Sequence, residues 1–171
     1  MIRSEKKLKN LDSLLKNDDD IQIAQAIEVL REEEPFEGAV GLLTTYYNNH
    51  DGNQVKKIIE EFMYDLKDQA LSKEVMEEIK KEWKPGTKTM LISSCWQSGL
   101  DYSEFTRDLI DIFLNSEFET AIECFTVVEE AIPLLSRAEK NEILQLIDDN
   151  PVSGENAKKA LTIELISLLG R

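Results

Sequence analysis

Histidine and cysteine are the residue types best suited to nucleophilic or metal chemistry, and this chain of 171 residues has few of them. His50 is the single histidine, and Cys95 and Cys124 are the two cysteines. A catalytic cysteine needs a histidine within hydrogen-bond reach, and a zinc site needs several cysteine and histidine ligands at short spacings. Cys95 and Cys124 stand 29 positions apart. The sequence therefore predicts no catalytic residue, no metal site and no cofactor, and hence no enzyme.

Acidic residues between positions 101 and 123 form the pattern that helix packing explains least. The first four are spaced three, four and three residues apart, which places them on one face of a predicted helix, and the last two lie one turn apart on the next helix. Like charges at these spacings repel one another by about 0.2–0.5 kcal/mol per pair. Two interpretations stay open: a solvated surface that keeps the protein soluble, or a docking surface for a Lys/Arg-rich segment of another protein. The six residues are Asp101, Glu104, Asp108, Asp111, Glu119 and Glu123.

The net charge limits the classes of partner that the chain can bind. The formal charge is −14, and positions 101–150 hold 13 acidic and 3 basic residues, a net charge of −10. Phosphate backbones and anionic lipid surfaces are both bound by clustered lysine and arginine. We therefore expect no nucleic acid and no membrane surface as a partner, and we expect the partner to be another protein.

The elements that position these residues are predicted to be helices. Apolar residues recur at three- and four-residue steps along the chain, as in Val55, Ile59 and Phe62, and no segment alternates as a half-buried strand does. Short connections between helices make neighbours antiparallel, and Pro133 is expected to end or kink the eighth helix. The sequence therefore predicts an all-α fold of about ten short antiparallel helices, at 4–16, 20–33, 36–49, 53–68, 71–83, 87–98, 102–115, 117–131, 137–148 and 155–169.

Local signals support several of the predicted helix starts. Pro35 is expected in the first turn of the third helix, where its missing N–H costs nothing. Four other starts match a capping box, in which a short polar side chain and the side chain three residues later each bond the other's backbone N–H. The predicted boxes are Asp51 with Gln54, Asp101 with Glu104, Ser116 with Glu119, and Ser136 with Glu139.

Two stretches of the chain resemble each other. Residues 42–63 and 91–114 share, in the same order, an apolar pair, a hydroxyl pair, an aromatic residue and a capping aspartate. A fainter third copy begins at Cys124, which matches Cys95. Similar helix pairs in succession resemble the HEAT and armadillo class of α-solenoids, and the resemblance implies an α-α superhelix forming one repeat-like domain over residues 1–171. An irregular helical bundle is the alternative.

The stretch LISSCWQSG at 91–99 carries no charged residue. We interpret it as a buried helix in which Cys95 acts as a small apolar side chain. The leading hypothesis is then a non-enzymatic scaffold that binds another protein, and the alternative is a small-ligand-binding or enzymatic bundle with a pocket near Cys95, Trp96 and Tyr47. Reduced cysteines without a signal peptide or a bilayer-long apolar run predict a cytoplasmic protein. A homodimer formed by stacking of exposed end helices stays an alternative assembly.

Overall fold

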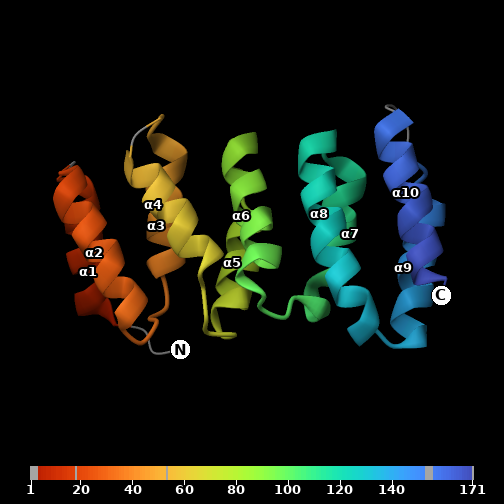
Figure 1. Cartoon of the computed structure of the whole chain (residues 1–171), viewed down its shortest axis with the longest axis horizontal. Helices are drawn as coiled ribbons and strands as arrows, with labels where there is room; N and C mark the ends of the chain where they lie inside the picture. The colour runs from red at the N-terminus through yellow and green to blue at the C-terminus, as the bar shows by residue number, and fades with distance from the viewer. Residues whose placement is uncertain (1–3, 18, 53, 153–155, 171) are drawn as a thin grey trace. The chain divides into compact units, whose positions relative to one another are not determined.

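Helices account for the regular secondary structure of the residues that this computed structural model describes, which are 4–17, 19–52, 54–152 and 156–170 (Figure 1). The predicted all-α fold of ten helices is confirmed within them. Two 3-10 turns, η1 (Ser103–Phe105) and η2 (Ile132–Leu134), adjoin the helices. No helix in this part of the chain is both long and apolar enough to span a lipid bilayer. The helices are α1 (Glu5–Lys16), α2 (Asp20–Glu32), α3 (Ala39–Asn49), α4 (Gln54–Tyr64), α5 (Leu71–Ile79), α6 (Pro85–Ser98), α7 (Thr106–Asn115), α8 (Phe118–Ala131), α9 (Arg137–Asp149) and α10 (Asn156–Leu169).

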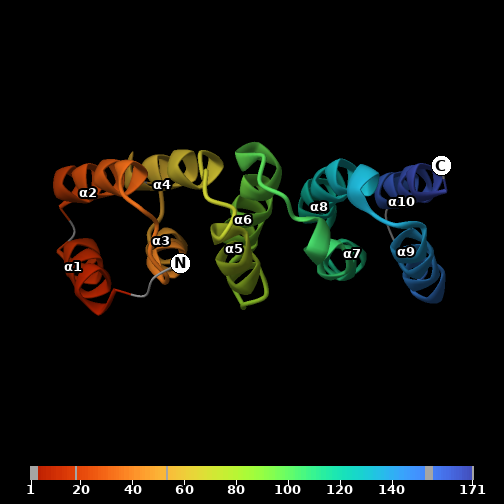
Figure 2. The same ribbon diagram turned by 90° about the horizontal axis from the view of Figure 1, so that it is seen from below.

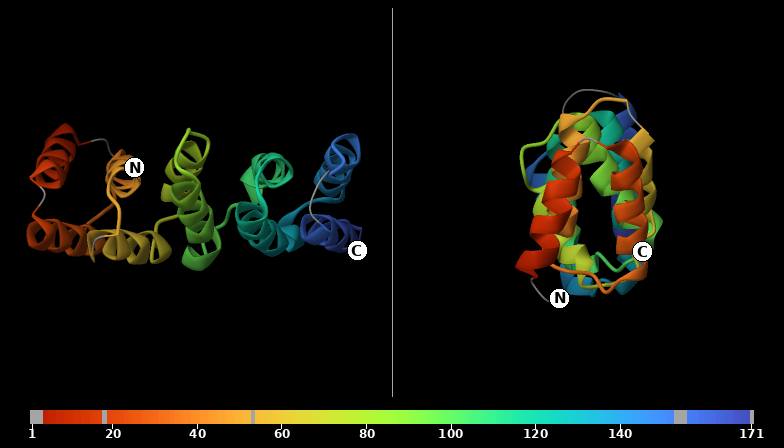
Figure 3. Two further views of the ribbon diagram at one scale, coloured as in Figure 1. Left: turned by 90° about the horizontal axis from the view of Figure 1, so that it is seen from above. Right: turned by 90° about the vertical axis from the view of Figure 1, so that its left-hand side faces the viewer.

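The chain divides into two compact units, Met1–Leu100 and Asp101–Arg171. In the first unit α1–α2, α3–α4 and α5–α6 form helical hairpins, and in the second α7–α8 and α9–α10 do so (Figure 1). Within each unit the first helices of the hairpins lie side by side in one layer, and the second helices form the other (Figures 2 and 3). Each unit is therefore a set of stacked helix pairs, which is compatible with a helical repeat.

The core of each unit lies between its two layers. Apolar residues at helical spacing turn one face of each helix inward, and full burial of one such side chain stabilises the folded state by about 1.5–3 kcal/mol. In α4 the predicted stripe is buried. Fully buried residues include Ile23, Ile27, Leu43, Ile59, Met63 and Leu91 in the first unit and Leu109, Ile110, Phe113, Cys124, Val128 and Leu165 in the second.

The third helix begins later than the sequence predicts. Gly38 has a φ of 96°, a left-handed conformation that glycine adopts without strain, and α3 starts after it at Ala39. A Cβ at Gly38 would also lie 2.7 Å from Cδ2 of Leu8. The position predicted for Pro35, in the first turn of this helix, is therefore wrong. By contrast, α8 ends at Ala131, just before Pro133, as predicted.

The capping boxes give a mixed result. The box at Ser136 is confirmed, because its N–H donates to Glu139 Oε2 over 2.7 Å and the N–H of Glu139 donates to Ser136 Oγ over 3.3 Å. The box at Ser116 is wrong, because the N-cap of α8 is Glu117, which makes no side-chain cap. The box at Asp51 falls at a helix start that includes residue 53, outside the described residues.

The similarity between residues 42–63 and 91–114 does not mark equivalent helices. It matches α3, the first helix of its hairpin, with α6, the second helix of the hairpin α5–α6. This similarity predicts that residues 91–98 form the first helix of a hairpin, and the prediction is wrong because they belong to the second. The fainter third copy does match equivalent helices, since Cys95 in α6 and Cys124 in α8 both lie in second helices of hairpins. Amphipathic spacing alone does not distinguish the two layers.

A buried carboxylate from α5 caps the N-terminus of α3. Glu74 is 8% exposed, and its Oε1 accepts hydrogen bonds from the backbone N–H of Gly38 over 3.1 Å and of Gly41 over 3.3 Å. These donors have no partner within their own helix, so a side chain from another hairpin satisfies them. Burial raises the pKa of Glu74; the backbone N–H groups act in the opposite direction, and the carboxylate of Glu78 adds to the rise.

Glu78 lies one turn further along α5 and approaches the same backbone. Glu78 is 4% exposed, and its Oε1 accepts a hydrogen bond from Lys81 Nζ over 2.6 Å. A Cβ at Gly41 would lie 2.7 Å from that oxygen. Glycine at position 41 therefore leaves the space into which the Glu78 carboxylate fits.

The second unit has a corresponding buried cation. Lys158 in α10 is 9% exposed, and its ammonium group donates to the carbonyl oxygens of Leu114, over 2.9 Å, and Ser116, over 2.5 Å. A cation is the charge that suits the C-terminal end of a helix dipole. Burial lowers the pKa of Lys158, while the nearby Glu117 carboxylate acts in the opposite direction. Lys158 therefore joins α10 to the end of α7, the helix that carries part of the acidic pattern.

Candidate functional site

The first two residues of the acidic pattern are not on an α-helix. Asp101 precedes η1, and its Oδ1 accepts a hydrogen bond from the N–H of Ser103 over 2.8 Å. This bond and a second one from the Ser103 hydroxyl lower the pKa of Asp101. Glu104 lies within η1, and α7 begins only at Thr106. The prediction of four carboxylates on one face of a helix over 102–115 is therefore wrong, and so is the capping box at Asp101.

The remaining four residues lie on both layers of the second unit. Asp111 in α7 and Glu119 in α8 are exposed, while Asp108 and Glu123 are half-buried. Both helices turn their apolar faces toward the core between the layers. Asp111 and Glu119, on the exposed faces of the two helices, therefore lie in different layers.

Glu104 instead lies in a groove between α7 and α9. Two adjoining cavities of about 160 and 330 Å³ share Arg107, Glu142 and Leu146 in their lining. The smaller cavity adds Glu104 and Glu139, and the larger adds Asn141, Gln145 and Asp149. Apolar side chains also line the smaller cavity, namely Leu135, Ile143 and Leu146.

The charged groups of this groove are mostly available to a partner. Glu104, Glu142, Asp149 and Arg107 are exposed, and their charged groups make no hydrogen bond or ion pair with any other residue that the structure describes. Glu139 is different, because one of its oxygens bonds Ser136 and this contact lowers the pKa of Glu139. The groove therefore combines apolar lining residues with carboxylates that have no partner among the described residues.

Three of these carboxylates, on Glu139, Glu142 and Asp149, were not among the residues expected to bind a partner. The sequence does contain a signal for them. Glu139, Glu142, Leu146 and Asp149 follow the same three-, four- and three-residue steps as the acidic residues at 101–111. This spacing places them on one face of α9, which is the face that meets α7 in the groove.

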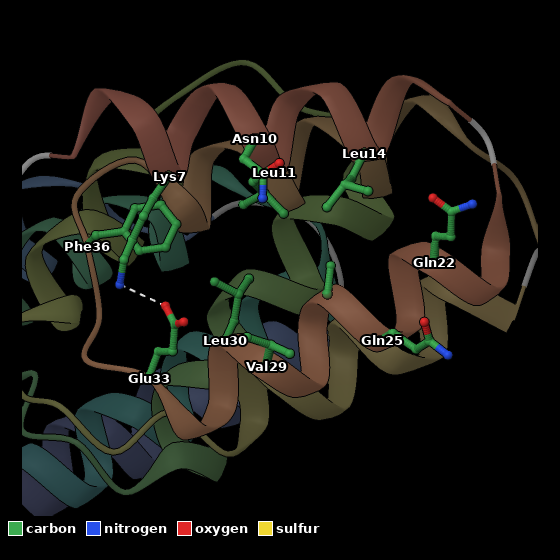
Figure 4. A pocket seen from close by; sticks show the side chains of 11 residues that line it. Lys7, Asn10, Leu11, Leu14, Gln22, Gln25, Val29, Leu30, Glu33 and Phe36 are labelled. Atoms are coloured by element: carbon green, nitrogen blue, oxygen red, sulfur yellow. Dashed lines mark hydrogen bonds and ion pairs between the residues drawn. The ribbon is translucent and has the colours of Figure 1, made fainter.

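A second groove, in the first unit, lies between α1 and α2 (Figure 4). It encloses about 400 Å³ and is lined by apolar residues that include Leu14, Val29 and Leu30. At one end Lys7 Nζ pairs with Glu33 Oε2 over 2.7 Å. Nothing in its lining singles out a class of ligand.

The residues considered for nucleophilic chemistry have local partners. Cys95 is 1% exposed, and its thiol donates to the Leu91 carbonyl over 3.5 Å. The His50 ring stacks on Tyr46, and its Nδ1 lies 2.8 Å from the Tyr46 carbonyl oxygen. A reactive thiolate needs a partly exposed, electropositive setting. The interpretation of Cys95 as a buried apolar residue is therefore confirmed.

Tyr47 and Trp96, the other residues of the alternative pocket, differ in exposure. Tyr47 is buried, and its hydroxyl donates to Glu60 Oε1 over 2.5 Å. Burial and this carboxylate both raise the pKa of Tyr47. Trp96 is half-buried. No three His, Cys, Asp or Glu side chains gather in a geometry that could hold a metal ion within the described ranges.

Thiol labelling tests the burial of both cysteines. Cys95 and Cys124 are buried and neither is in a disulfide, so we expect Ellman's reagent to modify neither in the native protein at neutral pH. In denaturing urea both thiols of the chain should react. Rapid labelling of native Cys95 would instead indicate an accessible thiolate and would favour the ligand-binding or enzymatic alternative.

No family model, curated protein or solved structure matches this chain.

Proposed function

We propose that this protein is a non-enzymatic scaffold whose second unit binds a lysine- and arginine-rich segment of another protein. The observation that carries the proposal is the groove between α7 and α9. It is lined by apolar side chains and by the carboxylates of Glu104, Glu142 and Asp149, which make no hydrogen bond or ion pair with the described residues. Apolar contact supplies affinity when water is excluded, and the carboxylates select a cationic partner.

The acidic residues outside the groove act at longer range in this proposal. The surrounding stretch, residues 101–150, has a net charge of −10, and such a field raises the rate at which a cationic partner associates. Asp108, Asp111, Glu119 and Glu123 contribute to this field from both layers. The effect is screened over about 8 Å at physiological ionic strength, so binding should weaken as salt is added.

The arrangement of the helices supports a related proposal on fold. Stacked helix pairs in two layers, as in each unit, are typical of the HEAT and armadillo class. We propose that this protein is a divergent member of that class. Such folds present a layer of parallel grooves to a partner, and the groove between α7 and α9 lies between two neighbouring helices of one layer.

Charge reversal in the groove tests the binding proposal. The probe is a short fluorescein-labelled peptide of lysine, arginine and leucine, with binding followed by fluorescence anisotropy. We expect Glu104→Lys with Glu142→Lys to weaken binding by about tenfold or more, because two uncommitted carboxylates become ammonium groups. Raising NaCl from about 50 to about 300 mM should weaken binding of the wild-type protein as well.

The matched control is Glu61→Lys with Glu77→Lys, which changes the net charge equally at exposed positions of the first unit. The variant Asp108→Lys with Asp111→Lys should have an intermediate effect, because it alters the field and leaves the groove intact. Binding that is indifferent to salt, to the Glu104 and Glu142 substitutions and to the Asp108 and Asp111 substitutions would contradict the proposed function.

A further inference from the structure

We propose that the smaller cavity of the α7–α9 groove receives the side chain of a single arginine from the partner. This inference rests on the proposed function and specifies the chemistry of its site. The apolar stem of the arginine would lie against Leu135 and Leu146, and its guanidinium group would lie between the carboxylates of Glu104 and Glu142.

The size and lining of the cavity suit one long side chain with an apolar stem. Its volume is about 160 Å³. Of its lining residues, Ile143 and Thr106 are buried, while Leu135 and Leu146 are half-buried. The Thr106 hydroxyl donates its proton to the Ser103 carbonyl over 2.7 Å, which leaves its oxygen able to accept a hydrogen bond. The leucine and isoleucine side chains offer apolar contact, as the stem of an arginine or lysine requires.

The charged rim distinguishes arginine from lysine. Glu104 belongs to η1 and Glu142 to α9, so the two unpaired carboxylates line the cavity from different elements. A guanidinium group is a planar fork with five N–H donors, and it can bond two carboxylates at once. An ammonium group is a compact, strongly hydrated charge on a flexible stem, so it is less suited to bridging two separate acceptors.

Arg107 is the protein's own cation in this groove. It lines both cavities and makes no ion pair with the described residues, although Glu104 and Glu142 line the same space. Its positive charge opposes the entry of a second guanidinium group at close range. Removing this charge by Arg107→Gln should therefore strengthen the binding of an arginine-bearing peptide.

The experiment compares two labelled peptides of equal length and charge, one with a single arginine among lysines and one with lysine throughout. We expect the arginine peptide to bind the wild-type protein about fivefold more tightly or better, in line with the strength of bidentate over single charge-assisted bonds. Glu104→Gln with Glu142→Gln should abolish this preference. The control Glu129→Gln with Glu130→Gln, at exposed positions of α8, should preserve it.

The outcomes separate this inference from the proposed function. If both peptides bind equally and in a salt-dependent manner, the arginine site is wrong and the acidic docking surface stands. If neither peptide binds, both proposals fail. A preference for arginine that survives Glu104→Gln with Glu142→Gln would place the arginine elsewhere and would overturn the assignment. Each Glu→Gln variant replaces an exposed carboxylate by an isosteric carboxamide, and its thermal unfolding is compared with that of the wild-type protein.

Discussion

Replacing Lys158 by methionine is expected to lower the free energy of unfolding of the second unit by about 2–3 kcal/mol, since a buried polar group that loses its partner costs about 1–3 kcal/mol. Methionine keeps most of the side-chain volume, but it leaves the carbonyl oxygens of Leu114 and Ser116 without the ammonium group that bonds them. Urea unfolding followed by circular dichroism measures the effect.

The neighbouring residue provides the matched control for this substitution. Lys159 is exposed, so Lys159→Met should change the free energy of unfolding by about 0.5 kcal/mol or less, as is usual for a surface substitution. Equal effects of the two substitutions would show that Lys158 does not hold the end of α7. Because α7 forms one wall of the groove, Lys158→Met should also weaken peptide binding, whereas Lys159→Met should not.

Removing the Glu74 carboxylate is expected to have the next largest effect. Glu74→Ala leaves the N–H groups of Gly38 and Gly41 without their acceptor, and loss of a helix N-cap typically costs about 0.5–2 kcal/mol. Two part-buried donors lose their acceptor at once, which places the expected loss near the upper end of that range. Glu74→Gln retains an oxygen acceptor and should therefore be much less destabilising than Glu74→Ala.

The glutamine variant should also differ from the wild-type protein in its dependence on pH. The pKa of Glu74 in the folded state is raised above its ordinary value of 4.5, chiefly by burial. A group whose pKa is raised on folding contributes stability that is full below the unfolded pKa and is lost as the pH rises through the folded pKa. Glutamine does not titrate, so Glu74→Gln should gain stability relative to wild type as the pH rises from about 4 toward neutral.

Unfolding in urea at several pH values measures this difference directly. Glu77→Gln is the control, since Glu77 is exposed on the same helix and its substitution also removes one carboxylate. A pH dependence of Glu74→Gln no larger than that of Glu77→Gln would show that Glu74 does not keep a raised pKa in the folded protein.

The sequence predicts the helices well because each helix is specified by its own residues. The spacing of Val55, Ile59 and Phe62 identifies both the helix and its buried face, and those residues are buried in α4. The sequence does not predict which helices pack against each other. A stripe at helical spacing shows which face is covered but not which helix covers it, so α3 was matched with α6 although they belong to different layers.

The burial of Glu74 and Glu78 is not among the predictions, although the sequence of α5 contains a local signal for it. In α5, Glu74 and Glu78 stand at the third and seventh positions after Leu71, in line with Val75 and Ile79. A charged residue within an apolar stripe indicates burial with a partner. The partner itself was not predictable, because Gly38 and Gly41 lie 36 and 33 positions from Glu74 and meet it only in the folded unit.

The candidate site is likewise predicted only in part by the sequence. The sequence identifies the acidic stretch at 101–150 and includes Glu104. It does not identify the groove, because Glu104 and Glu142 are brought together by the packing of α7 beside α9. Glu139, Glu142 and Asp149, together with Leu146, follow the spacing of the acidic residues at 101–111, but spacing alone does not show that α7 and α9 are neighbours.

The two buried caps have a consequence for how each unit unfolds. Glu74 joins the hairpin α3–α4 to α5–α6, and Lys158 joins α7–α8 to α9–α10. In simple repeat proteins the pairs contact only their neighbours and can open from an end, one pair at a time. Here an opened α5 or α10 leaves polar backbone of another hairpin unsatisfied, so amide hydrogen exchange at residues 38–41 should report the same cooperative opening as exchange within α5.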